Sequence, residues 1–183
     1  MNSTFETLLK VDEKLSDRLR VDANKPFRRA AVFFAHSGDS WFWMIGLILV
    51  WFLGKTTWHN RAAILAISIV IQAVFVLSIK FLIRRRRPES DWGEIYRRTD
   101  PHSFPSGHAT RAILLAVMAI GLGPVWFAWV LAIWAPIVCI ARVMLGVHYI
   151  SDILAGIVLG GLLGLIMLQL VPIMQRYFAF LFV

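Results

Sequence analysis

Five apolar segments are the feature that most restricts what this chain can fold into. They run from about residue 40 to 54, 62 to 83, 108 to 123, 124 to 145 and 152 to 171. A helix needs roughly 20 residues to cross a hydrocarbon core about 30 Å thick. The second, fourth and fifth segments reach that length, whereas the first and third reach it only with their less apolar flanks. The pattern predicts membrane-spanning helices.

The composition excludes the main alternatives. Of the 183 residues, 58% are hydrophobic and 16% are charged, whereas a soluble domain has about 45–50% apolar and about 25% charged residues. A water-soluble fold would leave large apolar patches exposed. The single cysteine, Cys139, allows no internal disulfide. We therefore exclude a cytosolic enzyme, a disordered tail and a disulfide framework. We predict an all-α polytopic helix bundle in the cell membrane, with about five transmembrane helices, or six helices counting an amino-terminal one.

Three regions are predicted along the chain: an amphipathic interfacial region over 1–39, a transmembrane core over 40–173 and a short tail over 174–183. In the first region, apolar residues recur at helical spacing, which predicts a helix lying on the membrane surface. Packing of this helix on the protein's own loops is the alternative. In the fifth apolar segment, Gly156, Gly160 and Gly164 form a row of small residues that permits close helix approach.

Three clusters of polar residues stand where hydropathy would disfavour them. The first runs from Lys80 to Pro88 and holds Lys80 and Arg87, which are seven residues apart and project from one face if the helix persists to Arg87. The second is the run from Phe104 to His108, where Ser106 and Gly107 would begin a helix whose unpaired amides attract an anion. The third runs from Arg142 to Asp152 and places His148 and Asp152 four residues apart, so that the carboxylate can reach the imidazole.

The order of the apolar segments allows these clusters to meet. If five spans alternate in direction, the connections after the second and fourth emerge on the same side of the membrane. The shared pocket would contain the fixed cations Lys80, Arg87 and Arg142 together with His108 and His148. Arginines bind phosphate oxygens bidentately, and a carboxylate-backed imidazole is an oriented base or a nucleophile. A second imidazole can protonate a leaving oxygen. This set predicts phosphoryl transfer to water through a phosphohistidine.

These three clusters resemble the signature motifs of the phosphatidic-acid phosphatase type 2 superfamily, K-x6-R-P, P-S-G-H and S-R-x5-H-x3-D. They occur in the family's order with matching spacing, and the resemblance covers roughly residues 40–170. Among its members, the chain is similar to bacterial phosphatidylglycerophosphatases and undecaprenyl-diphosphate phosphatases. One position departs from the pattern, since Ala141 stands where the family often has serine. The change removes a possible hydroxyl contact, and we expect it to adjust the activity rather than to abolish it.

The resemblance implies a role for each matching residue. His148 is the expected nucleophile, Asp152 orients it, and His108 protonates the leaving group and then activates water. The phosphate oxygens would be held by Lys80, Arg87, Ser106, Gly107 and Arg142. The resemblance also implies that no metal and no cofactor are needed, and the cations crowding His148 and Asp152 argue against Mg²⁺ or Zn²⁺.

Several other polar residues have a simpler interpretation, outside the catalytic chemistry. The run Arg84 to Arg86 is expected to contact lipid headgroups rather than substrate, and Asp100 and His102 are expected to be solvated. His36 matches no signature and is expected on the surface. Arg111 is expected to line the site entrance or to pair with a loop carboxylate.

The expected substrate is an amphiphilic lipid phosphate. Polyprenyl diphosphate, phosphatidylglycerol phosphate, phosphatidate and lipid A phosphate all fit, and the additional arginines favour a diphosphate. A lipid phosphotransferase and a non-catalytic protein that binds or transports anionic lipids are the alternatives. The net charge of +8 is assigned to lipid headgroups and to the substrate, not to nucleic acid. The distribution of basic residues favours a cytoplasmic site, whereas the resemblance favours the extracytoplasmic face, which we adopt. Oligomeric state is left open.

Overall fold

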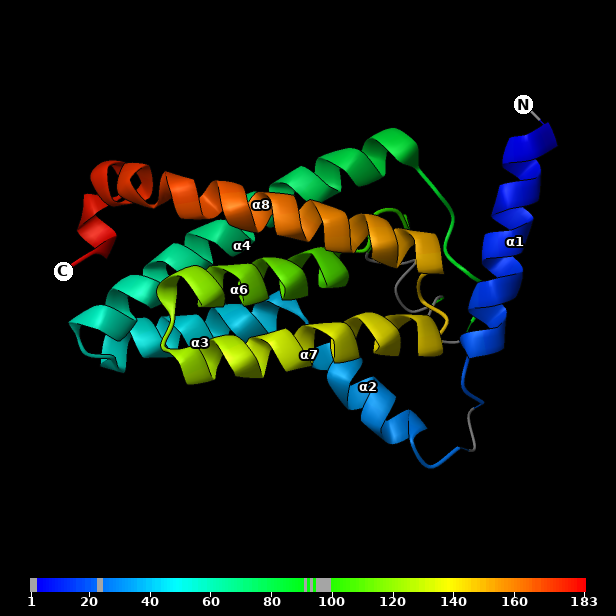
Figure 1. Ribbon diagram of the computed structural model, residues 1–183, viewed down its shortest axis with the longest axis horizontal. Helices are drawn as coiled ribbons and strands as arrows, with labels where there is room; N and C mark the ends of the chain where they lie inside the picture. Colours follow the sequence, from blue (N-terminus) through cyan, green and yellow to red (C-terminus); the bar gives the residue numbers. More distant parts are fainter. Residues whose placement is uncertain (1–2, 23–24, 91, 93, 95–99) are drawn as a thin grey trace.

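The computed structural model describes residues 3–22, 25–90, 92, 94 and 100–183. Over these residues it contains seven α-helices and one short 3-10 helix (Figure 1). They are α1 (Ser3–Leu19), α2 (Arg28–Ser37), α3 (Ser40–Leu53), α4 (Thr56–Ile83), α6 (Gly107–Leu122), α7 (Val125–Met144), α8 (Ile150–Tyr177) and the 3-10 helix η1 (Ala179–Leu181). The predicted all-α fold class is confirmed.

The number of membrane spans differs from the sequence prediction. Three helices, α4, α7 and α8, are long and apolar enough to cross a membrane, and α2 with α3 makes a fourth if the pair is one span bent by 56°. Helix α6 has 16 residues and covers only about 24 Å, less than the hydrocarbon thickness. The structure therefore supports three to four spans in place of about five, because the third apolar segment forms a short helix among longer ones.

Helix α6 lies in the centre of the bundle and packs against α8, α7 and α4 (Figure 1). Its side chains Leu114, Leu115 and Met118 are completely buried. The glycine row of α8 faces α6, as the small-residue spacing predicted. A Cβ at Gly160 would overlap the carbonyl oxygen of Thr110 and lie 3.0 Å from the Cβ of Ile113. The two helices are close because α8 has no side chain there.

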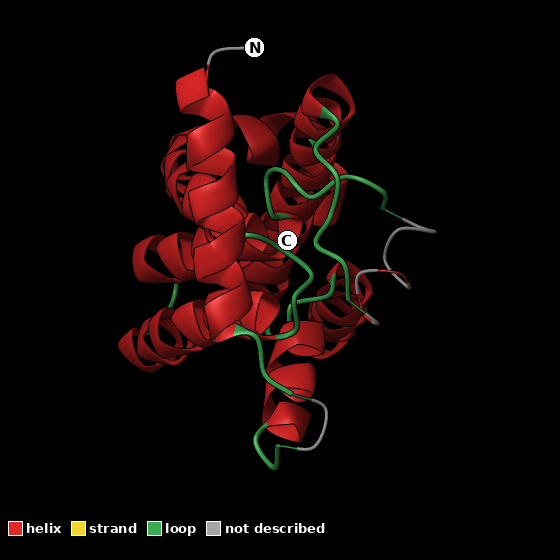
Figure 2. Ribbon diagram, turned by 90° about the vertical axis from the view of Figure 1, so that its right-hand side faces the viewer, coloured by secondary structure: helices red, strands yellow, loops and turns green. Residues whose placement is uncertain are grey.

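Helix α1 crosses the end of the bundle at which α7 ends and α8 begins (Figures 1 and 2). Its polar face packs on the protein: the Ser16 hydroxyl accepts a hydrogen bond from the Ile150 amide at 2.9 Å, and Asp12 accepts one from the Ser151 amide at 3.1 Å. Leu8 and Leu19 remain exposed. One face of α1 therefore contacts the protein, as the alternative interpretation predicted, and leucines of the other face are exposed.

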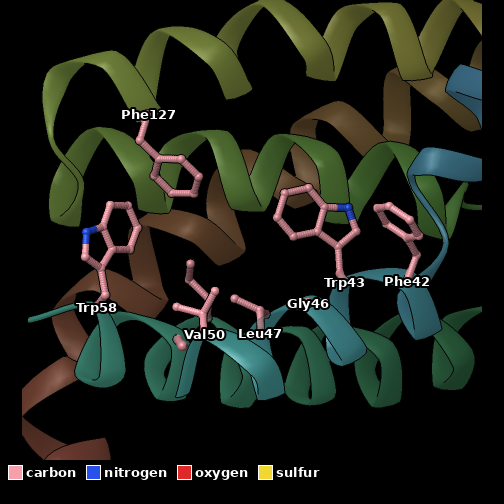
Figure 3. Close-up of a pocket in the computed structure, with 9 residues that line it drawn as sticks. Phe42, Trp43, Gly46, Leu47, Val50, Trp58 and Phe127 are labelled. Carbon is pink, nitrogen blue, oxygen red and sulfur yellow. The ribbon is translucent and has the colours of Figure 1, made fainter. Parts of the chain in front are cut away.

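An apolar pocket of about 240 Å³ lies on the side of the bundle, between α3, α4 and the start of α7 (Figure 3). Trp43 and Trp58 stand towards its two ends, and Val50 and Phe127 lie between them. None of its lining residues belongs to the three polar clusters. The pocket is part of the apolar packing of the bundle and carries no polar chemistry of its own.

Candidate active site

The three polar clusters meet at the end of the bundle covered by α1. The Arg87 guanidinium of the first cluster donates a hydrogen bond to the Val147 carbonyl at 2.9 Å and lies 3.2 Å from His148 Nε2. The Ser106 amide of the second cluster donates to the Asp152 carbonyl at 3.0 Å. Residues from three distant parts of the chain therefore surround the first turn of α8.

His148 is buried in the connection between α7 and α8, with 1% of its side chain exposed. A guanidinium can only donate, so His148 Nε2 accepts from Arg87 and the ring proton lies on Nδ1. That nitrogen faces Asp152 Oδ2 at 3.5 Å, longer than a normal hydrogen bond. Burial, followed by the charges of Arg87 and Arg142, holds the pKa of His148 well below its usual value. The imidazole is therefore neutral, with a lone pair on Nε2 directed at the cations.

Asp152 is held in place by the fold of its own helix and by a cation. Its Oδ2 accepts from the Tyr149 amide at 2.9 Å, which caps α8, and its Oδ1 accepts from Arg85 at 2.8 Å. The same Arg85 binds the Asp12 carboxylate of α1 at 2.7 Å. Arg85 was expected to contact lipid headgroups, and this expectation is wrong: the side chain is 17% exposed and links α1 to the carboxylate behind His148.

The cations Lys80, Arg87 and Arg142 are all buried. Lys80 and Arg87 share one partner, since Asp100 Oδ2 pairs with the Lys80 ammonium and lies 2.7 Å from Arg87 Nη2. Asp100 was expected to be solvated, but its carboxylate is engaged with two of the predicted phosphate-binding cations. A carboxylate and a phosphate compete for the same donors. Asp100 thus occupies part of the binding capacity that an anionic substrate would use.

Ser106 caps the amino terminus of α6. Its side chain is buried and accepts from the Ala109 amide at 3.4 Å, while its own amide is bonded to Asp152. The hydroxyl of Ser106 therefore caps α6, and its amide joins α6 to α8. Gly107 and His108 follow in the first turn of α6, where backbone amides point along the helix axis and favour an anion.

His108 has a carboxylate partner that the sequence motifs do not contain. Its Nε2 lies 2.6 Å from Asp39 Oδ1, and the other oxygen of Asp39 lies 3.1 Å from His36 Nδ1. His36 is 36% exposed, so it lies at the surface as expected and in addition contacts Asp39. Arg111 is buried, with 4% of its surface exposed, and donates to the Gly38 carbonyl at 2.8 Å. The only sequence signal for Asp39 is a carboxylate directly before an apolar segment.

Comparison with known proteins shows the family. Residues 61–176 match the PAP2 superfamily. A decaprenylphosphoryl-5-phosphoribose phosphatase of Mycobacterium tuberculosis is 39% identical over 104 residues, which are 54% of this chain and 54% of that protein. The chain therefore spans about half the length of that curated relative. An undecaprenyl-diphosphatase of Sulfolobus acidocaldarius is 31% identical over 144 residues, covering 76% of this chain and 68% of the relative.

Solved structures share the fold. A transmembrane PAP2-type phosphatidylglycerolphosphate phosphatase from Bacillus subtilis superposes with a TM-score of 0.72 at 23% identity, over 93% of this chain and 89% of that one. LpxE of Aquifex aeolicus gives a TM-score of 0.66 at 22% identity, over 88% and 94% of the two chains. The sequence match over residues 61–176, together with this transmembrane fold, shows that the chain is a multi-pass membrane protein that belongs to the PAP2 superfamily.

Proposed function

We propose that this chain is an integral membrane lipid phosphatase that hydrolyses a phosphomonoester or a diphosphate of a membrane lipid. The observation that carries the proposal is the environment of His148: a neutral, buried imidazole with its Nε2 beside Arg87 and its Nδ1 towards Asp152. Binding a headgroup alone would require the cations but not a carboxylate-backed imidazole among them. This difference favours catalysis over the alternative of passive lipid binding.

In the first step, His148 Nε2 attacks phosphorus and the bond to the leaving oxygen breaks. The Nδ1 proton stays on the ring, whose positive charge is balanced by Asp152. His108 gives a proton to the departing oxygen, so the lipid leaves as an alcohol or, from a diphosphate, as a monophosphate. Lys80, Arg87 and Arg142 stabilise the charge on the three equatorial oxygens. The product of this step is phosphohistidine and a neutral His108.

In the second step, water attacks the phosphohistidine. His108 takes a proton from the water, the bond between phosphorus and Nε2 breaks, and inorganic phosphate leaves. His108 is then protonated again and His148 is neutral again, so the cycle closes without a metal ion. A lipid phosphotransferase would follow the same first step and pass the phosphoryl group to an acceptor other than water.

A polyprenyl phosphate or diphosphate is the substrate class we favour. The curated relatives named above are a decaprenylphosphoryl-5-phosphoribose phosphatase and an undecaprenyl-diphosphatase. Arg84 and Arg86, next to the cation cluster, could bind a second phosphate. The location of the site at helix ends, with exposed leucines on the neighbouring α1, suits a headgroup that reacts while its tail stays in the bilayer. We place the site on the extracytoplasmic face; labelling of a cysteine introduced at Glu94 in intact cells tests this placement.

Phosphate release from lipids in detergent tests the function. The purified protein is expected to release phosphate in the presence of EDTA, to be inhibited by vanadate and to become inactive in His148→Ala. A comparison of undecaprenyl diphosphate, phosphatidylglycerol phosphate and phosphatidate identifies the preferred class. Release that disappears in EDTA, or survives unchanged in His148→Ala, would contradict the mechanism. Equal rates on all three lipids would remove the preference for diphosphates.

A further inference from the structure

A second carboxylate–imidazole pair lies opposite the first. Asp39 Oδ1 is 2.6 Å from His108 Nε2, and the two side chains are 14% and 15% exposed. Asp39 Oδ2 is 3.1 Å from Nδ1 of His36, a residue that is more open to solvent. Both oxygens of one carboxylate are thus occupied by imidazole nitrogens. The pair formed by His148 and Asp152 is matched by a pair formed by His108 and Asp39.

The segment that carries Asp39 is fixed to the helices around it. Arg111 of α6 donates to the Gly38 carbonyl at 2.8 Å. The indole nitrogens of Trp43 and Trp134 bind the Ser37 carbonyl at 3.0 Å and the Ser37 hydroxyl at 2.8 Å. A Cβ at Gly38 would lie 3.0 Å from Val138 and 3.3 Å from His108 Cδ2. The bend between α2 and α3 is therefore held against α6 and α7, with glycine at the point of closest approach.

This anchoring fixes the orientation of the His108 ring. The edge formed by Nε2 and Cδ2 faces the bend between α2 and α3. The ring nitrogen on the opposite edge is Nδ1. Burial, followed by the charge of Arg142, lowers the pKa of His108, whereas the hydrogen bond and the charge of Asp39 act in the opposite direction and favour the protonated ring.

We infer that Asp39 is a positioning residue for His108, holding its Nε2–H so that Nδ1 gives a proton to the leaving oxygen and takes one from water. His36 holds the second oxygen of Asp39 and prevents the carboxylate from rotating. No net proton passes to Asp39: the Nδ1 proton moves to the leaving oxygen and is replaced by one from water. This inference rests on the proposed phosphatase function and adds a residue outside the three motifs.

The test compares two leaving groups in Asp39→Asn, His108→Ala and the double variant. Phosphatidate releases diacylglycerol, whose alkoxide needs a proton as it departs. p-Nitrophenyl phosphate releases p-nitrophenolate, a stable anion that needs little help from a general acid. The value of kcat/KM reports only the steps up to leaving-group departure. For Asp39→Asn we expect kcat/KM to fall about 100-fold on phosphatidate and less than about 3-fold on p-nitrophenyl phosphate, because general acid catalysis is worth roughly 10²–10⁴. The double variant should match His108→Ala, since Asp39 acts through His108.

Asp17→Asn is the matched control, because it makes the same chemical change at an exposed carboxylate of α1, and it should leave both rates unchanged. An equal loss on both substrates in Asp39→Asn, or a double variant well below His108→Ala, would show that Asp39 acts through general stability and would overturn the inference. Failure of the proposed function gives a different result: the unchanged protein would release phosphate from none of the lipids tested above, or His148→Ala would remain active.

Discussion

Replacing Gly160 by alanine should disturb the site from a distance. Gly160 lies in the middle of α8, where a Cβ would overlap the Thr110 carbonyl oxygen and approach Ile113 Cβ to 3.0 Å. The first contact is with backbone, which cannot rotate away as the end of a flexible side chain can. Helices α6 and α8 must therefore separate to admit the methyl group.

The magnitude follows from two opposing effects. Overpacking of a well-packed core costs about 1–3 kcal/mol, and the change from glycine to alanine within a helix returns about 1 kcal/mol. A net destabilisation of about 0–2 kcal/mol is expected. The effect on rate is larger, because α6 carries His108 in its first turn and α8 carries Asp152. A displacement of about 1 Å between reacting groups can lower a rate roughly 100-fold, so we expect a fall in kcat/KM of about 10- to 100-fold.

The adjacent residue provides the control. Gly161 belongs to the same helix, and a Cβ there would meet no atom within 4 Å. Gly161→Ala should therefore keep full activity and gain up to about 1 kcal/mol from helix propensity. Phosphate release and thermal unfolding in detergent measure both variants. If Gly160→Ala is as active and as stable as Gly161→Ala, the close packing of α6 on α8 does not position the site.

Three further predictions concern the groups around the phosphate. Asp152→Asn should lower kcat about 10²- to 10⁴-fold with little change in lipid binding, because the amide cannot balance the charged imidazole; single-turnover phosphate release measures this, and a loss below tenfold would refute it. Because burial and the neighbouring arginines keep the pKa of His148 well below its usual value, and because the neutral ring is the nucleophile, protonation of His148 should lower kcat/KM only below pH 6.5. A kcat/KM that already declines as the pH is lowered from 7 would contradict this assignment. Asp100→Asn should lower the inhibition constant of vanadate about 3- to 30-fold, since it removes a negative charge paired with Lys80 and Arg87; an unchanged constant would mean that Asp100 does not compete with the anion.

The residues of the three clusters could be found from sequence because their relationships are local. The spacing of four places His148 just before α8 and Asp152 in its first turn, with the two side chains 3.5 Å apart. Helices α6 and α7 run antiparallel, so the connections after α4 and α7 lie at one end of the bundle (Figure 1). Ser106 similarly caps α6 directly before His108, as the motif predicts. The expectation that Lys80 and Arg87 share one helix face is wrong, because α4 ends at Ile83 and Arg84 turns into the left-handed region. The two cations meet through Asp100 instead.

The remaining partners depend on tertiary contacts that no local pattern encodes. Asp39 and His108 are 69 residues apart, and Arg85 and Asp12 are 73 apart. Their pairing requires the bend between α2 and α3 and the docking of α1, neither of which hydropathy specifies. The run of arginines also misled the interpretation, because Arg85 turns inward to Asp152 while its charge pattern resembles a headgroup-binding collar. The span count failed for a related reason: α6 is shielded by neighbours and need not reach the full membrane thickness.

The most direct test of the account is to identify the residue that carries the phosphoryl group. Mixing the protein with a lipid phosphate and quenching in alkali during the first turnover preserves a phosphohistidine, which peptide mass spectrometry can locate. The account predicts phosphate on His148 in the unchanged protein, more of it in His108→Ala because dephosphorylation is slowed, and none in His148→Ala. Turnover without any phosphorylated histidine, or with phosphate on His108, would contradict it.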